Sequence, residues 1–66
     1  MTIGERIREV RLKNDMSLRD FAKVIGVSNT AVMKWEKDTA KISFEKAIEI
    51  CKCFNVSLNW LAGWED

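Results

Sequence analysis

The sequence predicts an all-α domain of five short helices, and three observations support this fold class. Apolar residues recur at intervals of three and four along most of the 66-residue chain, as they do on one face of a helix. The chain lacks strand-like alternation with paired turn signals, and it contains no proline. Each of its four serines stands where a helix is expected to begin, because a serine hydroxyl can accept a hydrogen bond from an amide of the first turn.

The first helix is expected near residues 3–13. Its apolar stripe consists of Ile3, Ile7 and Val10. Thr2 stands at the N-cap position, where its hydroxyl, like that of a serine, can accept a hydrogen bond from an amide of the first turn. Glu5, three residues later, completes a capping box, since its carboxylate can reach back to the N-cap amide.

The second and third helices are expected near residues 18–25 and 29–37, after Ser17 and Ser28. The second carries an apolar stripe made of Leu18, Phe21, Ala22 and Ile25. Gly26 lies between the two helices and suits the left-handed residue that ends a helix. At about 100° per residue, the third helix separates into two faces. One face holds Ala31, Val32 and Trp35, and the other holds Asn29, Thr30, Met33, Lys34 and Lys37.

The fourth and fifth helices are expected near residues 44–54 and 58–62, after Ser43 and Ser57. The predicted apolar stripe of the fourth helix consists of Phe44, Ala47, Ile48 and Cys51. Asn55 and Gly63 suit the ends of these two helices, because both residue types tolerate a left-handed backbone.

Composition argues against several classes of protein. Cys51 and Cys53 are one residue apart and histidine is absent, so neither a disulfide nor a zinc site is expected. The chain has no glycine-rich phosphate loop and no nucleophile beside a plausible base, so we expect no enzyme, cofactor or small-molecule substrate. The N-terminus is charged from Glu5 onward and has no apolar run of signal-peptide or membrane-spanning length. These features favour a reduced, cytoplasmic protein without a membrane partner.

Charge is distributed unevenly along the chain. Residues 1–41 hold nine lysines and arginines against six acidic residues, whereas residues 42–66 hold two against four. A basic N-terminal part is compatible with a polyanionic partner, although solvated surfaces also show such imbalances.

Residues 18–37 resemble the helix-turn-helix of the lambda-repressor and Cro family. The matching positions are small Ala22, Gly26 and the apolar residues Phe21, Ile25, Val27, Val32 and Trp35. The likeness continues outside this motif: "GERIREVR" resembles the first helix of the family, "KWEKD" the end of its recognition helix, and "ISFEKAIEICKCFNVSLNWLAGWED" its last two helices. The resemblance implies one compact five-helix domain over residues 1–66, with the motif at 18–37 and a tail at 63–66.

The resemblance also implies a function. Such a chain is expected to be a sequence-specific transcriptional regulator, a repressor of phage or prophage type that binds double-stranded DNA. It would occupy a pseudo-palindromic operator as a homodimer. The ending at Asp66 suits a stand-alone regulator as well as the DNA-binding part of a longer repressor. The rival interpretation is a protein-interaction module on the same fold, such as an antitoxin.

Four positions depart from the pattern of the family. Leu18 replaces a glutamine whose amide caps the second helix and contacts a phosphate, and Arg19 is a candidate substitute for that contact. The other three departures, Asp38 and Asn55 for frequent glycines and Ile42 for a frequent proline, are interpreted as structural variations.

The third helix is the one that the resemblance places in the DNA major groove. Asparagine can pair with adenine and lysine can reach guanine, while threonine and methionine can contact a thymine methyl group. We therefore predict base reading by Asn29, Thr30, Met33 and Lys34. Phosphate contacts are predicted for Ser28, Arg19, Lys37 and Lys41, although Lys37 and Lys41 equally suit ordinary solvated positions.

Two further groups of residues receive structural predictions. By the resemblance, Arg11 on the first helix forms an ion pair with Glu36 at the end of the recognition helix. Near the C-terminus, Trp60 and Leu61 are expected to help close the core, whereas Trp64 has little to pack on. The possible dimer contact consists of Trp60, Leu61 and Trp64, since tryptophan is enriched at interfaces. The alternative is that Trp64 folds back onto its own domain.

Overall fold

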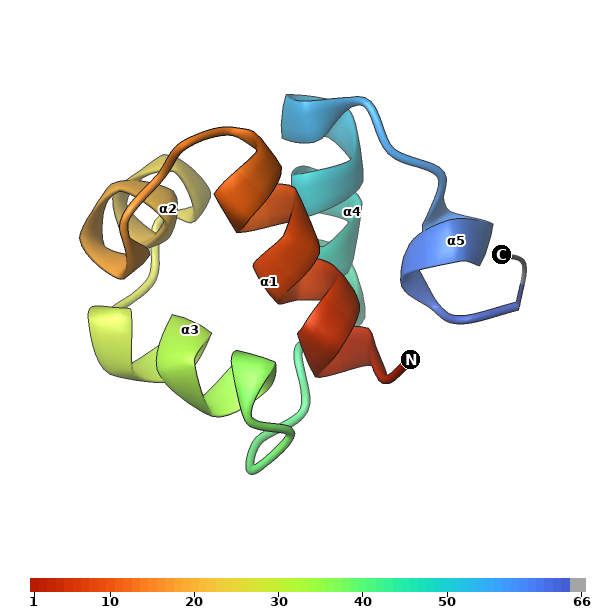
Figure 1. The fold of residues 1–66 in the computed structure, drawn as a ribbon, viewed down its shortest axis with the longest axis horizontal. Helices are drawn as coiled ribbons and strands as arrows, with labels where there is room; N and C mark the ends of the chain where they lie inside the picture. The colour runs from red at the N-terminus through yellow and green to blue at the C-terminus, as the bar shows by residue number, and fades with distance from the viewer. Residues whose placement is uncertain (65–66) are drawn as a thin grey trace.

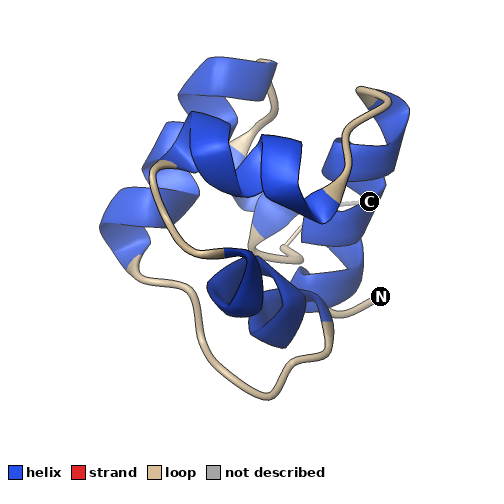
Figure 2. Cartoon of the chain, turned by 90° about the vertical axis from the view of Figure 1, so that its left-hand side faces the viewer, coloured by secondary structure: helices blue, strands red, loops and turns tan. Residues whose placement is uncertain are grey.

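The computed structural model describes residues 1–64, and every secondary-structure element within them is a helix (Figures 1 and 2). The helices are α1 (Ile3–Lys13), α2 (Leu18–Ile25), α3 (Asn29–Glu36), α4 (Phe44–Phe54) and α5 (Leu58–Leu61). The predicted all-α fold of five helices is thus confirmed. The third and fifth helices end one residue earlier than expected, with Lys37 and Ala62 as their C-caps. Residues 65 and 66, at the end of the predicted tail, lie outside the described residues.

Every helix begins at the hydroxyl residue that the sequence indicates. The Thr2 hydroxyl accepts from the amide of Glu5 at 3.1 Å, and the Thr2 amide donates to the Glu5 carboxylate at 2.8 Å, which completes the capping box. The serine caps accept in the same way from the amide three residues later, at Ser17, Ser28, Ser43 and Ser57. Such a cap contributes about 0.5–2 kcal/mol, a considerable share of the stability of so small a domain.

Helix α1 crosses the middle of the fold and packs against α3 and α5, while α2 packs against α3 and α4 (Figure 1). The buried apolar core draws on all five helices and consists of Ile7, Val10, Phe21, Ala22, Ile25, Val32, Trp35, Ala47, Ile50 and Leu61. The rings of Phe21 and Phe54 stack at its edge, with centroids 5.2 Å apart. This arrangement fixes α2 and α3 on one side of α1.

The predicted apolar stripe of α4 is partly wrong. Ala47 is buried as expected, but the other fully buried residue is Ile50, whereas Ile48 and Cys51 are only half-buried. Phe44 is 68% exposed. It lies in the first turn of α4, beside a surface groove, so the core-facing side of α4 is rotated toward Ile50 relative to the prediction.

Candidate nucleic-acid interface

Helices α2 and α3 meet at a tight turn centred on Gly26. Gly26 has φ +79°, and its amide and that of Val27 both donate to the carbonyl of Ala22, at 2.8 and 3.0 Å. Val27 is half-buried against the core. From α4, the Lys46 ammonium donates to the carbonyl of Ile25 at 3.1 Å. The turn is therefore held both by its own backbone and by a lysine that sequence reasoning missed.

Helix α3 has the two faces that the sequence predicts. Val32 is fully buried and Trp35 is 7% exposed. On the outer face Asn29, Thr30 and Lys34 are exposed, and Met33 is half-buried. The four predicted base-reading residues therefore lie on the outer face of one helix, and three of them are exposed.

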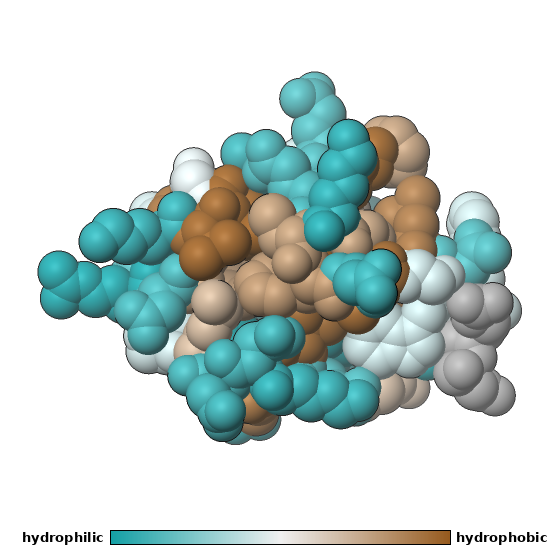
Figure 3. Space-filling model, turned by 90° about the horizontal axis from the view of Figure 1, so that it is seen from above, coloured by the Kyte–Doolittle hydropathy of each residue, from teal (hydrophilic) through white to brown (hydrophobic). Residues whose placement is uncertain are grey.

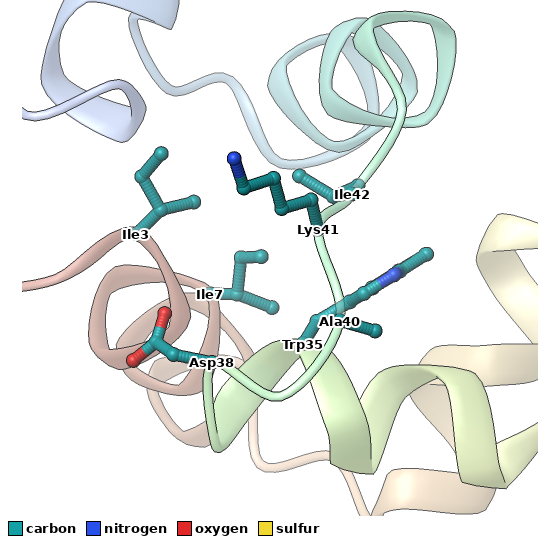
Figure 4. A pocket seen from close by; sticks show the side chains of 7 residues that line it. All are labelled: Ile3, Ile7, Trp35, Asp38, Ala40, Lys41 and Ile42. Carbon is teal, nitrogen blue, oxygen red and sulfur yellow. The ribbon is translucent and has the colours of Figure 1, made fainter.

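The residues predicted to contact phosphates differ in where their side chains lie. Ser28, Arg19 and Lys37 are exposed around the two ends of α2 and α3. The Ser28 hydroxyl accepts from the Ala31 amide at 3.1 Å, which leaves its own hydrogen available to a phosphate oxygen. Lys41 differs, because its side chain extends across a cavity beside Ile3 and away from α3 (Figure 4).

Leu18, which replaces the glutamine frequent in the family, is half-buried and packs against the core. Its side chain thus contributes packing, and Arg19 beside it is exposed.

Arg11 and Glu36 form a bidentate ion pair between α1 and α3. Arg11 Nε and Nη2 donate to the two Glu36 carboxylate oxygens at 2.7 and 3.0 Å, and Arg11 Nη1 donates to the carbonyl of Met16 at 3.0 Å. The side chains are only 12% and 8% exposed. The hydrogen bond with Glu36 raises the pKa of Arg11 above its ordinary value. This pair fastens the last turn of α3 to α1.

Asp38 makes a second connection between α3 and α1, which sequence reasoning missed. Its Oδ2 accepts from the Thr2 hydroxyl at 2.6 Å, and its Oδ1 accepts from the Gly4 amide at 3.0 Å. Asp38 also has φ +58°, a conformation in which glycine is common. The aspartate at a position where the family frequently has glycine is the sequence feature that could have indicated these contacts.

The three C-terminal residues of the predicted dimer contact lie in different surroundings. Leu61 is buried in its own core at 1% exposure, so its side chain offers no contact surface. Trp60 is half-buried, with the Arg6 guanidinium 5.0 Å from its ring centroid. Trp64 is 81% exposed. It borders a groove of about 290 Å³ lined by Ile3, Ile42, Ser43, Phe44, Ala47, Leu58, Leu61, Ala62 and Trp64.

Residues 1–64 contain no group of three or more His, Cys, Asp or Glu side chains arranged to hold a metal. Burial raises the pKa of the half-buried Cys51 thiol, and Cys53 is exposed. No helix among these residues has the length and hydropathy needed to cross a membrane.

Two helices that meet at a glycine turn, the second with one face in the core and a polar face outward, define a helix-turn-helix domain. A family model described as helix-turn-helix matches residues 7–61. The chain belongs to this helix-turn-helix family, of the lambda-repressor and Cro type.

Proteins similar in sequence include an antitoxin and several transcriptional regulators. Antitoxin PezA of Streptococcus pneumoniae is 34% identical over 83% of this chain and 35% of its own length. The regulator DicA of Escherichia coli is 33% identical over the whole chain and 50% of its own length. Repressor protein C2 of Salmonella phage P22 is 32% identical over 89% of this chain and 27% of its own length. The chain thus spans half or less of these proteins.

The fold closely matches solved structures of the P22 c2 repressor. The crystal structure of that repressor in complex with synthetic operator 9T has a TM-score of 0.89 and 29% identity, covering 98% of both chains. The solution structure of its DNA-binding domain has a TM-score of 0.84 and 31% identity, covering 96% of this chain and 84% of that one.

Proposed function

We propose that this chain is a sequence-specific DNA-binding transcriptional regulator, a repressor of phage or prophage type. The observation that carries the proposal is the outer face of α3, where Asn29, Thr30 and Lys34 are exposed at the start and middle of the second helix of a helix-turn-helix. The likeness to a repressor captured on operator DNA supports it. In this proposal α3 enters the major groove with its N-terminal end leading.

Base reading follows from the chemistry of this face. Asn29 can accept from N6 and donate to N7 of adenine, and Lys34 can donate to O6 or N7 of guanine. Thr30 and the half-buried Met33 offer apolar contact to a thymine methyl group. Arg19, Ser28 and Lys37 would hold the helix in register by binding phosphates, which orient the protein without specifying sequence. Lys41 can join them only if its side chain turns away from the cavity beside Ile3.

The proposal includes a homodimer on a pseudo-palindromic operator, in the cytoplasm of a bacterial or phage-infected cell. Trp64, with the apolar groove that it borders, is the part of the proposed contact that is available to a second copy. The half-buried Trp60 would add part of its ring to this contact. The buried Leu61 would act only by packing in the core behind it. Two domains related by a two-fold axis would place their α3 helices about one DNA turn, ~34 Å, apart. No cofactor and no small-molecule substrate is part of the proposal.

Selection of bound duplexes from a random pool tests the function. The expected result is an enriched palindrome with half-sites about one DNA turn apart. Absence of enrichment at low salt would refute the proposal. Sedimentation at rising concentration, with the wild type and Trp64→Ala, tests the dimer: a variant that sediments and binds as the wild type does would exclude Trp64 from the contact.

Individual contacts can then be assigned on the enriched site. Asn29→Ala should lose discrimination at one base-pair position, by about 1–3 kcal/mol. Lys37→Ala should instead weaken binding to all sequences alike and lower the salt slope by about one. Unchanged discrimination at every position by Asn29→Ala would exclude Asn29 from base reading.

A second candidate function is an antitoxin-like interaction module, and the similarity to PezA favours it. Apolar surface is also found away from α3: seen from above the view of Figure 1, an apolar band lies between hydrophilic side chains (Figure 3). The polar outer face of α3 argues for DNA, because a protein-binding helix would present apolar residues there. Steep salt dependence of duplex binding would separate the two functions.

A further inference from the structure

Asp38 carries a negative charge directly after the helix proposed to enter DNA. It follows Lys37, the C-cap of α3, and lies four residues after Lys34 in the sequence. Both lysines belong to the proposed DNA contacts. An unpaired carboxylate at this place would attract their ammonium groups and repel phosphates.

The structure directs this carboxylate toward α1. One oxygen accepts from the Thr2 hydroxyl at 2.6 Å and the other from the Gly4 amide at 3.0 Å. Figure 4 shows the Asp38 side chain pointing from the loop toward the first turn of α1. We refer to these contacts as the Thr2–Asp38–Gly4 bridge.

The bridge depends on the close approach of α1 to the end of α3 and on the Thr2 hydroxyl. A Cβ atom at residue 4 would collide with the carbonyl of Trp35 and lie 2.7 Å from Asp38 Oδ1, so the helices approach this closely only because Gly4 has no side chain. The Thr2 hydroxyl also has two roles, since it accepts from the Glu5 amide at 3.1 Å while it donates to Asp38. A single hydroxyl therefore connects the start of α1 to the residue after α3.

We infer that the Thr2–Asp38–Gly4 bridge controls the DNA affinity of α3 by holding the Asp38 carboxylate on α1, so that Lys34 remains available to bases and Lys37 to phosphates. Thr2 and Asp38 are then positioning residues, which act on DNA without touching it. The inference rests on the proposed function, because it concerns the strength of the same DNA contact.

Four proteins test the inference: the wild type, Thr2→Val, Asp38→Asn and the double variant. Valine keeps the shape of threonine but cannot donate to the carboxylate. Thr2→Val should weaken duplex binding by up to about tenfold at low salt, since it removes one of the two hydrogen bonds that hold the Asp38 carboxylate on α1 and leaves only the one from the Gly4 amide. The loss relative to the wild type should shrink at high salt, where the repulsion is screened. In the Asp38→Asn background, Thr2→Val should change affinity little, because the side chain at position 38 then carries no charge.

Two control variants separate the bridge from the helix cap. Glu5→Ala removes the other half of the capping box but leaves the hydroxyl of Thr2 and the carboxylate of Asp38 in place. It should lower the melting temperature without the salt-dependent loss of affinity. Thr2→Ser keeps the hydroxyl and should bind as the wild type does. All affinities are measured at a temperature where circular dichroism shows each variant to be folded.

Several outcomes would overturn the inference. Thr2→Val that binds as tightly as the wild type at low salt would show that the bridge does not affect DNA binding. An equal loss in both backgrounds and at both salt concentrations would show an effect of shape alone. A wild type that binds no duplex sequence specifically would instead overturn the proposed function, and this inference with it.

Discussion

The ion pair between Arg11 and Glu36 allows a quantitative prediction about stability. Replacing Glu36 with alanine would leave the Arg11 guanidinium, now 12% exposed, without its two carboxylate contacts at 2.7 and 3.0 Å. Removing one partner of a buried pair costs about 3–5 kcal/mol. Because Arg11 keeps its bond to the carbonyl of Met16, we expect the lower end of this range, about 3 kcal/mol.

A loss of this size is large for a 66-residue domain. At typical values per residue its total free energy of unfolding is roughly 3–10 kcal/mol. Glu36→Ala should therefore be partly unfolded at moderate temperature and should lose DNA binding for that reason. Where the variant remains folded, its discrimination between operator sequences should resemble that of the wild type, since Glu36 faces α1.

Urea unfolding followed by tryptophan fluorescence measures the effect. A double-mutant cycle with Arg11→Met should give a smaller loss for the double variant than for the two single changes added together, because neither charge is then buried alone. Lys13→Ala is a matched control: its ion pair with Glu9 is long, at 3.6 Å, and exposed, so the change should stay within about 0.5 kcal/mol. A cost of Glu36→Ala below about 1 kcal/mol, or strict additivity with Arg11→Met, would refute the reasoning.

Three further predictions concern other residues. Hydrogen bonds from Thr2 hold the pKa of Glu5 below its ordinary value of 4.5. The Glu5 carboxylate therefore stabilises the fold fully above pH 4.5, and this contribution is lost as the pH falls through the lower pKa of the folded state. Urea titrations should show that the wild type is more stable than Glu5→Gln at neutral pH and that this difference disappears in acid. Gly4→Ala should destabilise the fold by about 1–3 kcal/mol despite the better helix propensity of alanine, because its methyl group meets a backbone carbonyl of α3; a Tm equal to or above that of the wild type would contradict this. Cys53 should react with a thiol reagent faster than Cys51, whose pKa is raised by burial; mass spectrometry of the early product should find the label on Cys53, and a label mainly on Cys51 would contradict this.

Local signals predicted the helices well because their causes are local. A hydroxyl cap needs only an amide three residues away, so Thr2 and the four serines marked the five helix starts. Gly26 and Asn55 adopt the expected left-handed backbone because few other residue types tolerate it. The two faces of α3 follow from helical periodicity in the same way. Among the candidate site residues, the exposed ones of α3 could be chosen from the sequence for this reason.

The less accurate predictions depended on neighbours that periodicity does not supply. The buried side of α4 is shifted toward Ile50, because α2 and α5 decide which side of the helix is covered. Leu61 is in the core as expected and Trp64 is exposed, so of these two residues of the predicted dimer contact only Trp64 is available to a second copy. Lys41 is exposed as expected, but its direction depends on the loop that carries it.

The sequence by itself determined the all-α fold, the helix boundaries to within a residue, and the polar face that α3 presents, since these follow from spacing along the chain. Only the tertiary structure decided how that face is held. The contacts of Asp38 with Thr2 and Gly4, and of Lys46 with the turn after α2, join residues more than 20 positions apart. Such contacts depend on how closely two helices approach, and that distance is set by packing of the whole core.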